Sequence, residues 1–281
     1  MPELAYVNGS FLPIEKAMVP VEDRGYQFGD AVYEVIASYD GRPVFMDEHM
    51  ARLDRSLKEL SFPAISIDQI RSAVIELFGR AKIENAEIYL QISRGVSPRN
   101  HAFPENTDTQ FVMTARKIMK VPENIRQHGA KAITVKDLRW GRCDIKTVQL
   151  LYNVLAKQKA LDSGVFDAIF LSEENIVREA TSSNLFIVDN GKLITHPLTS
   201  NILPGVTRGK IIEIYGENNL QINEKFFNKE ILLKSDEVFL TGTISEVLSI
   251  VEIDGLKIGN GKVGPIVKQL FNALRIRSKQ N

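Results

Sequence analysis

Apolar and polar residues alternate along several short stretches of the first part of the chain, which predicts strands. In residues 31–38 the odd-numbered side chains, beginning with Tyr33, share one face, and the even-numbered ones, with Glu34 among them, share the other. Residues 87–93 and 111–115 have the same character, and Asn8-Gly9 favours a tight hairpin turn before them. The pattern therefore predicts a sheet in this part of the chain.

Helical spacing appears between those strands. Met50, Leu53 and Leu57 recur at three- and four-residue intervals after Asp47, which predicts a helix beginning there. Ser66 followed by a glutamine three residues later has the spacing of a capping box, which predicts a second helix running to about residue 78.

Strands and helices also alternate in the second part of the chain. We expect strands at 131–135, 167–171, 184–188 and 237–240, and a final helix from about residue 265. A helix is predicted over residues 147–163, and Gly164 would end it. We expect its buried face to consist of Leu150, Leu151, Val154, Leu155, Gln158 and Leu161.

A connector separates the two parts. Residues 117–122 end in Val121-Pro122, and the residue before a proline is pushed toward extended conformations. We therefore expect an N-terminal domain over residues 1–118, a linker over 119–122 and a C-terminal domain over 123–281.

Composition limits the class of protein. The 281 residues are 44% hydrophobic and 25% charged, as in an ordinary globular protein, and the 35 basic residues balance the 35 acidic ones. Zero net charge gives no support to nucleic-acid or anionic-membrane binding. A single cysteine, Cys143, forms no intramolecular disulfide, and the N-terminus lacks the features of a signal peptide. We expect a cytoplasmic protein.

Lys146 is the first candidate for chemistry. It follows a turn with Trp140, Cys143 and Asp144, and it precedes an apolar stretch. Apolar surroundings lower the pKa of a lysine amine, because desolvation disfavours the ammonium form, and such an amine is a candidate nucleophile. Most lysines are solvated surface charges, however, so the residue needs support from the rest of the chain.

Three further groups could bind charged ligands. Glu179 precedes a run of small polar residues that leads into a strand, and Arg52 lies beside the apolar face of its helix. Val206 and Thr207 begin a helix, whose free N–H groups favour an anion. The turn around Thr243 adds hydroxyls that could hold phosphate oxygens.

A polar loop at residues 93–104 carries the last candidates. Arg99 and His101 are two positions apart, with Arg94 nearby, and two prolines make regular structure improbable there. An arginine fork with a histidine donor suits a carboxylate or a phosphate. An ordinary exposed basic loop would have the same spacing.

Pyridoxal phosphate would use all of these groups, because it needs a lysine, a carboxylate and a phosphate site. The chain resembles the class IV aminotransferases, the fold-type IV pyridoxal-phosphate family, along essentially its whole length. The motifs that carry the resemblance are Glu179 with Thr181, Asn184, Leu185-Phe186 and Thr195, and Leu203-Pro204-Gly205-Val206-Thr207-Arg208. Those most similar to the D-amino-acid branch of the family are Glu22 to Asp30, Tyr33-Glu34-Val35, Arg94-Gly95, Ser97-Pro98-Arg99, His101 and Arg142 to Lys146.

The resemblance implies an α+β fold in two domains, a small N-terminal α/β domain and a larger C-terminal domain with a barrel-like β core. It implies pyridoxal 5'-phosphate as cofactor and no metal. Lys146 would form the Schiff base and move the proton, and Glu179 would pair with the pyridine nitrogen. The remaining cofactor contacts would come from Arg52, Leu203, Val206, Thr207 and Thr243. The substrate carboxylate would be held by Tyr33, Arg99 and His101.

The resemblance also implies a homodimer, in which Arg99 and His101 come from the other subunit. The expected reaction is ping-pong transamination of D-amino acids such as D-alanine or D-glutamate, with 2-oxoglutarate or pyruvate as acceptor. Alternatives on the same fold are a branched-chain L-aminotransferase, which Leu203-Pro204-Gly205 resembles, and an aminodeoxychorismate lyase. An (R)-selective amine transaminase and a cofactor-binding protein without turnover are also open.

Overall fold

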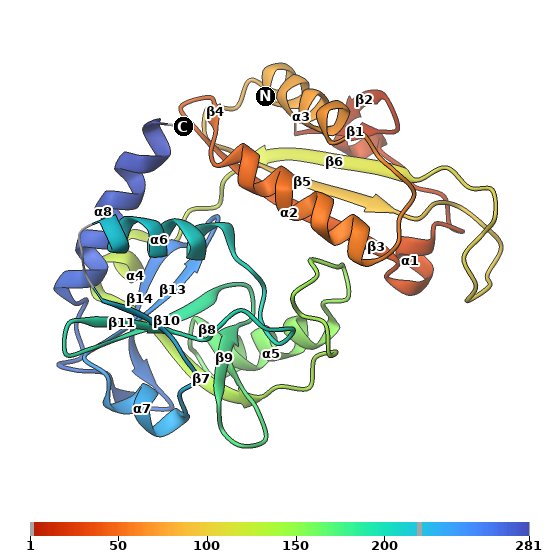
Figure 1. The fold of residues 1–281 in the computed structure, drawn as a ribbon. Coiled ribbons are helices and arrows are strands. Elements are labelled where there is room, and N and C mark those ends of the chain that lie inside the picture. Colours follow the sequence, from red (N-terminus) through yellow and green to blue (C-terminus); the bar gives the residue numbers. More distant parts are fainter. Residues whose placement is uncertain (1–2, 218–220, 281) are drawn as a thin grey trace. The chain divides into compact units, whose positions relative to one another are not determined.

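The structure is a computed structural model that describes residues 3–217 and 221–280 (Figure 1). The chain divides into two compact units. The first extends to Met119 and also includes Ile145–Gln149; the second consists of Lys120–Asp144 and Leu150–Gln280. The five residues around Lys146 thus pack with the first unit, although the chain before and after them belongs to the second. The domain limits expected from the sequence, 1–118 and 123–281, stay a prediction.

The first unit is built on an antiparallel sheet of six strands in the order β2-β1-β6-β5-β3-β4. Its strands are β1 (Leu4–Val7), β2 (Ser10–Pro13), β3 (Ala31–Tyr39), β4 (Arg42–Pro43), β5 (Ala86–Ser93) and β6 (Gln110–Lys117). Its helices are the 3-10 helix η1 (Ile14–Lys16), α1 (Arg24–Phe28), α2 (Met46–Glu59) and α3 (Ile67–Ala81). The strands and the two long helices expected in this part of the chain are confirmed.

Helices α2 and α3 cover one face of this sheet. Met50 and Leu53 of α2 and Val74 of α3 form one buried cluster with Ile36 and Leu90 of the strands. The Ser66 hydroxyl accepts a hydrogen bond from the amide of Gln69 at 3.3 Å, as the capping pattern predicted. The alternation seen in the sequence therefore separates the face toward the helices from the face that carries Tyr33.

The segment around Lys146 extends the sheet at the beginning of β3. The amide of Tyr33 donates to the carbonyl of Lys146 at 3.0 Å, and the amide of Val148 donates to the carbonyl of Ala31 at 3.2 Å. Val32 and Thr147 form the antiparallel bridge between these two bonds. Three consecutive residues thus act as a short additional strand, which fixes the backbone of Lys146.

The second unit contains the remaining elements. Its strands are β7 (Ala130–Lys136), β8 (Asp167–Leu171), β9 (Val177–Ala180), β10 (Asn184–Asp189), β11 (Lys192–Thr195), β12 (Ile222–Glu224), β13 (Glu237–Gly242), β14 (Glu246–Ile253) and β15 (Leu256–Lys257). Its helices are α4 (Glu123–His128), α5 (Leu151–Asp162), α6 (Val206–Glu217), α7 (Lys229–Lys234) and α8 (Pro265–Gln280).

Six strands of this unit close into a ring. The pairing runs β10-β13-β14-β7-β8-β9 and returns to β10, where Glu179 pairs with Asn184. Strands β11 and β12 extend the sheet beyond β10, and β15 pairs with β14. Ile169, Leu185 and Leu240 belong to the apolar cluster that fills this sheet. The barrel-like core expected in the second part of the chain is confirmed.

The expectation for the helix after Lys146 was wrong in two respects. Helix α5 begins at Leu151 rather than at residue 147. Leu151, Val154 and Leu155, which were expected to be buried, are 74%, 60% and 55% exposed, and Leu161 is exposed as well. The helix packs instead through Ala156 and Ala160 against a cluster with β7 and β8. Helical spacing detects an apolar row but does not reveal which partner covers it, and small residues make the close contact here.

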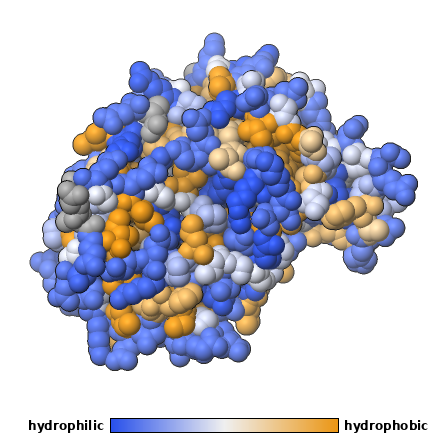
Figure 2. Space-filling model, viewed as in Figure 1, coloured by the Kyte–Doolittle hydropathy of each residue, from blue (hydrophilic) through white to orange (hydrophobic). Residues whose placement is uncertain are grey.

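Other apolar side chains also reach the surface. Figure 2 shows that they do so in several separate patches among hydrophilic residues on the face in view. Within the described residues, no helix combines the length and the apolar character needed to cross a membrane.

Candidate active site

Lys146 and Tyr33 lie together in the first unit. The Lys146 Nζ atom is 4.2 Å from the centroid of the Tyr33 ring, and both side chains are half-buried. The amide of Lys146 also donates to the hydroxyl of Ser56 on α2 at 3.3 Å. An amine over a ring face gains cation–π attraction when it is charged. The structure thus brings together two of the predicted site residues, with the backbone of one hydrogen-bonded to that of the other.

Arg52 belongs to a buried ionic cluster that the sequence did not predict. Its Nε and Nη2 atoms donate to the two oxygens of Glu34 at 2.6 and 2.7 Å. His49, one turn earlier on α2, lies 2.8 Å from Glu34 through Nδ1. Because an ionised carboxylate only accepts hydrogen bonds, Nδ1 carries the proton of the neutral ring. The sequence signal was available: Glu34 lies on the inward face of β3, where a carboxylate needs a buried partner.

The protonation states of this cluster follow from its burial. Burial alone would raise the pKa of Glu34, but the Arg52 guanidinium and then His49 hold that pKa well below its usual value. Burial lowers the pKa of His49, against the attraction of Glu34. Glu34 is therefore ionised at neutral pH. Two N–H groups of the Arg52 guanidinium donate to its carboxylate and fix the guanidinium in place.

Glu179 is the centre of the second group, in the second unit. It lies on β9, only 5% exposed. Its Oε1 atom accepts from Nη1 of Arg139 at 2.6 Å. Its Oε2 atom accepts from Nδ2 of Asn184 at 2.9 Å and from the amide of Leu203 at 3.1 Å. Burial raises the pKa of Glu179, while Arg139 and the Leu203 amide oppose that rise.

Arg139 is a site residue whose role the sequence did not suggest. Besides Glu179 it contacts Asp137 twice, with Nε to Oδ1 at 3.0 Å and Nη2 to Oδ2 at 2.8 Å. Arg178 donates to the same Asp137 oxygen at 2.7 Å. Arg139 also donates to the carbonyl of Asn201 at 3.1 Å. The Asp137 carboxylate and the Asn201 carbonyl therefore hold the Arg139 guanidinium against Glu179. The charges in the sequence do not show which of them meet.

The beginning of α6 is joined to Glu179 through Asn184. Its Nδ2 atom also donates to the carbonyl of Leu203 at 2.8 Å. A Cβ atom on Gly205 would lie 2.0 Å from Oδ1 of Asn184, so only glycine fits there. The helix then starts at Val206, with Thr207 buried in its first turn. Asn184 thus fixes the position of the Glu179 carboxylate relative to the N-terminus of α6.

The turn after β13 carries Thr243, and it lies against the residues that follow β9. Gly242 has no room for a side chain beside the Ser183 hydroxyl, 3.0 Å from where its Cβ would be. The hydroxyls of Ser183 and Ser245 are 3.4 Å apart. The role of Thr243 in holding phosphate oxygens stays a prediction.

The donor set of the second unit fits pyridoxal phosphate. A carboxylate offers about four lone-pair positions, and the described contacts fill three of those on Glu179. One position therefore suits the protonated nitrogen of a pyridine ring. The N-terminus of α6, a helix of twelve residues, offers amides with a buried threonine hydroxyl for a phosphate group.

Arg99 and His101 lie together on the loop between β5 and β6, in the first unit. The Arg99 Cζ atom is 4.5 Å from the centroid of the Phe28 ring, and the His101 ring centroid is 5.4 Å from it. Arg99 also donates to the carbonyl of Gln27 at 3.4 Å. Both side chains are exposed. One aromatic ring thus supports two of the predicted carboxylate-binding residues.

The solved structures that superpose on this chain include aminotransferases and a putative lyase. The branched-chain amino acid aminotransferase of Escherichia coli superposes with a TM-score of 0.91 at 28% identity, covering 98% of this chain and 94% of that one. A putative 4-amino-4-deoxychorismate lyase from Legionella pneumophila superposes with a TM-score of 0.84 at 26% identity, covering 94% and 98%. The fold is therefore that of the fold-type IV aminotransferases, as the sequence predicted.

Sequence comparison places the chain more narrowly. The family described as amino-transferase class IV matches residues 31–253. A D-alanine aminotransferase of Bacillus licheniformis is 42% identical over 269 residues, which cover 95% of this chain and 94% of that protein. One of Staphylococcus haemolyticus is 40% identical over 266 residues, 94% of each. The chain belongs to the class IV aminotransferase family, and its expected nature as a transaminase is confirmed.

Proposed function

We propose that this aminotransferase uses pyridoxal phosphate to transfer the amino group of a D-amino acid such as D-alanine to a 2-oxo acid such as 2-oxoglutarate or pyruvate. The observation that carries the substrate class is the pair Arg99 and His101 on the Phe28 ring. An arginine fork beside a histidine donor matches an α-carboxylate. The D-alanine aminotransferases that share about two fifths of the sequence support the same substrate.

The cofactor, when bound, supplies an electron-withdrawing ring that acidifies the α-proton of the substrate. Lys146 would provide the amine for its aldehyde and, once released, would move the proton from the substrate α-carbon to the C4′ carbon of the cofactor. Tyr33 lies directly under that amine and limits where it can move. The extra strand formed by residues 146–148 holds the backbone of the lysine while its side chain exchanges the proton.

Glu179 would hold the proton on the pyridine nitrogen. A carboxylate whose pKa is raised by burial is a stronger base toward a neighbouring N–H, and the charge-assisted bond is about twice as strong as a neutral one. Arg139 keeps the carboxylate ionised, and Asn184 and the Leu203 amide orient it. Leu203 would also pack against the ring.

The phosphate group would be bound by the amides of Val206 and Thr207 and by the hydroxyls of Thr207 and Thr243. A helix N-terminus favours a dianion through its free N–H groups and its dipole. Arg52 would add a positive charge, oriented by its two bonds to Glu34.

A homodimer is part of this proposal, with Tyr33 and the partner subunit's copies of Arg99 and His101 binding the substrate carboxylate. Support comes from α5, where Leu151, Val154 and Leu155 form an exposed apolar row at helical spacing. Burial of such a row against a second copy would release its apolar surface from water.

A single-turnover titration tests the proposal. The purified protein loaded with pyridoxal phosphate receives D-alanine or L-leucine without any 2-oxo acid, and the product is measured together with the visible absorbance of the cofactor. One equivalent of pyruvate from D-alanine only is the expected result. Product from L-leucine only would overturn the D-amino-acid assignment.

Branched-chain transamination is the second candidate, because the Escherichia coli branched-chain enzyme shares the fold over almost the whole chain. L-Leucine is its diagnostic substrate in the same titration. Lyase chemistry would differ from both, since a lyase releases its product repeatedly without an acceptor, whereas a transaminase stops after one turnover.

A further inference from the structure

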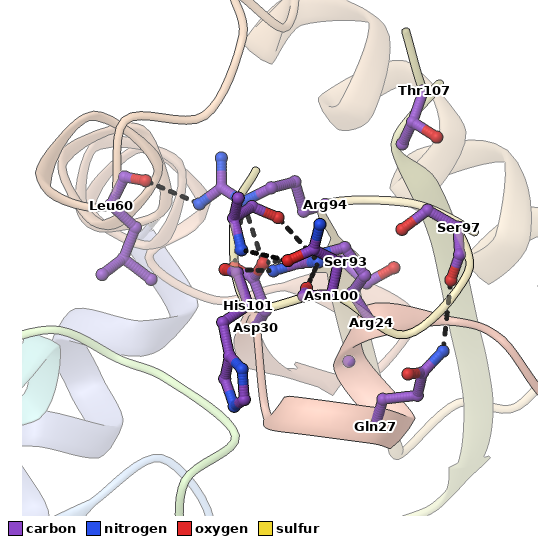
Figure 3. A network of polar contacts seen from close by, with 12 residues as sticks. Arg24, Gln27, Asp30, Leu60, Ser93, Arg94, Ser97, Asn100, His101 and Thr107 are labelled. Carbon is purple, nitrogen blue, oxygen red and sulfur yellow. Dashed lines mark hydrogen bonds and ion pairs between the residues drawn. The ribbon is translucent and has the colours of Figure 1, made fainter. Parts of the chain in front are cut away.

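Arg24, the first residue of α1, is a buried arginine with no place in the function proposed above. Its side chain is 3% exposed. Its Nη1 atom donates to the carbonyls of Asn100 at 2.6 Å and Ala102 at 3.2 Å, and its Nη2 atom donates to the carbonyl of His101 at 3.4 Å (Figure 3). One guanidinium therefore holds three consecutive carbonyls of the loop that carries Arg99 and His101.

The guanidinium is itself anchored. Its Nε atom donates to Asp30 at 2.9 Å, and Arg94 donates to both oxygens of the same aspartate at 3.1 and 2.9 Å. Arg94 in turn donates to the carbonyl of Leu60, which follows α2 (Figure 3). It also donates to the carbonyl of Ser61. Arg24 is thus tied to a second buried arginine and, through it, to the end of a long helix.

The base of the loop is fixed independently of the Arg24 side chain. Gly95 has a φ of +122°, and a Cβ atom there would lie 2.0 Å from Cγ2 of Thr107 and 2.5 Å from the carbonyl oxygen of Asp108. The Thr107 hydroxyl donates to the carbonyl of Val96 at 2.9 Å. These contacts close the loop at its base, whereas the backbone carbonyls of residues 100–102 at its tip are held by the Arg24 side chain.

The side chains of the tip rest on the same short helix. Phe28 is one turn from Arg24, and its ring centroid lies 4.9 Å from Cζ of Arg24. The same ring contacts Arg99 and His101. Helix α1 therefore contacts the loop tip in two ways. Arg24 binds the backbone of the tip, and Phe28 contacts its side chains.

We propose that Arg24 is a positioning residue for the substrate α-carboxylate, because it fixes the backbone from which Arg99 and His101 project. The inference rests on the function proposed for those two residues. Only a planar guanidinium with five N–H donors reaches an aspartate and three carbonyls at once; a lysine ammonium has three donors around one atom. A displacement of the loop by about 1 Å is enough to lower the rate about a hundredfold.

The test compares D-alanine with D-alaninamide, which lacks the carboxylate charge, in single turnovers of the cofactor-loaded enzyme. In Arg24→Lys we expect the rate constant over the dissociation constant to fall at least about tenfold for D-alanine and to change less than about threefold for D-alaninamide. Arg80→Lys is the matched control, since Arg80 also pairs with a carboxylate and lies over an aromatic ring but contacts no residue of the loop. An equal fall for both substrates, or no fall, would overturn the proposal.

Hydrogen exchange provides a readout that needs no turnover. Peptides covering residues 97–104 should exchange faster in Arg24→Lys than in the wild type, while peptides from β5 and β6 should not change. Unchanged exchange at the loop would also overturn the proposal. Arg24→Gln, which leaves Arg94 and Asp30 as a neutral pair, replaces the lysine variant in both measurements if that variant does not fold.

The two assignments can fail separately. A wild-type enzyme that converts no amino acid contradicts the proposed function, while the exchange measurement still reports whether Arg24 holds the loop. The opposite case is a wild-type enzyme that converts D-alanine and an Arg24 variant whose rate constants over dissociation constants for D-alanine and D-alaninamide equal those of the wild type. That result contradicts the role of Arg24 alone.

Discussion

Glu179 and Asn184 are paired twice. Their backbones form the β9–β10 contact that closes the ring of strands, and the Asn184 side chain donates to the Glu179 carboxylate at 2.9 Å. The same two residues therefore close the barrel and orient the Glu179 carboxylate. A change that displaces the Asn184 side chain should affect both the stability of the second unit and its binding of the cofactor.

Gly205→Ala tests this relationship. The added methyl would lie 2.0 Å from Oδ1 of Asn184, which is held by two hydrogen bonds, so Asn184 must move. We expect a loss of about 1–3 kcal/mol in the free energy of unfolding, typical of overpacking, and weaker pyridoxal-phosphate binding. Urea unfolding and titration of the cofactor-free protein measure these effects.

Gly209→Ala is the control on the same helix. Apart from its chain neighbours and the backbone of its own helix, no atom lies within 4 Å of the position of its Cβ, and alanine is the better helix former. This variant should therefore gain up to about 1 kcal/mol. Equal behaviour of the two variants would contradict the argument from Asn184.

Lys146→Ala should abolish transamination while the protein stays folded. The described side-chain contact of Lys146 is with the Tyr33 ring, so its removal should change the free energy of unfolding by no more than about 1 kcal/mol. Product formation and urea unfolding, measured on the same preparation, separate chemistry from folding. Lys136→Ala, which removes an exposed lysine, should keep its rate. A Lys146 variant with a near-normal rate would take the residue out of the mechanism.

Arg99→Ala should weaken productive binding of substrates with an α-carboxylate far more than that of simple amines. The bidentate charge-assisted contact is lost, which should lower the rate on D-alanine by about a hundredfold or more. D-Alaninamide serves as the amine without a carboxylate charge, and Arg116→Ala serves as the control for loss of an exposed arginine. Equal effects on both substrates would remove Arg99 from the carboxylate site.

Glu34→Gln should strongly destabilise the first unit. The change removes the carboxylate charge with which the buried Arg52 guanidinium pairs, and breaking a buried pair in this way costs about 3–5 kcal/mol. Glu76→Gln removes the partner of the exposed Arg80 and should cost less than about 0.5 kcal/mol. Urea unfolding at neutral pH compares the two, and similar losses would show that burial of the first pair is not decisive.

His49 should make the protein sensitive to mild acid. Burial lowers its pKa below the usual 6.5, so the unfolded chain takes up a proton at a higher pH than the folded one. Its contribution to stability is complete above pH 6.5 and is lost as the pH falls through the lower, folded-state value. The slope is at most about 1.4 kcal/mol per pH unit.

Urea unfolding between pH 7.5 and 5.5 gives the free energy of unfolding at each pH. The slope of that free energy against pH should become shallower in His49→Asn, by an amount that corresponds to at most one proton. The slope that remains contains His196, whose pKa burial lowers in the same direction. An unchanged slope in the variant would mean that His49 takes up its proton over the same pH range in the folded and the unfolded chain, so that burial does not lower its pKa.

Much of the fold could be predicted from the sequence, because the buried positions of a strand or helix recur with its period and are mostly apolar. The even-numbered residues of β3 face the helices as their alternation indicated, and Ser66 caps α3 as its spacing indicated. The burial expected for the apolar row of α5 was wrong. The same helical period arises whether such a row packs inside the unit or lies at its surface.

The contacts within the candidate site could not be predicted, because they join residues that are distant in sequence. Arg139 meets Glu179 across 40 positions, and Arg24 meets the carbonyl of Asn100 across 76. Neither residue differs in local pattern from a solvated arginine. Glu34 is the exception, since a carboxylate on the apolar face of a strand needs a buried charged or hydrogen-bonding partner.

The short strand that carries Lys146 has a consequence for how the polypeptide matures. Lys146 reaches Ser56 across a separation of 90 residues, and its bonds to β3 span a still longer loop. Contacts of such high order form late, because the entropy of closing the loop must be overcome first. In a nascent chain that has completed only its first sheet, the amine proposed as the nucleophile would therefore not yet be in place beside Tyr33, and it would reach that position only after synthesis has passed residue 149.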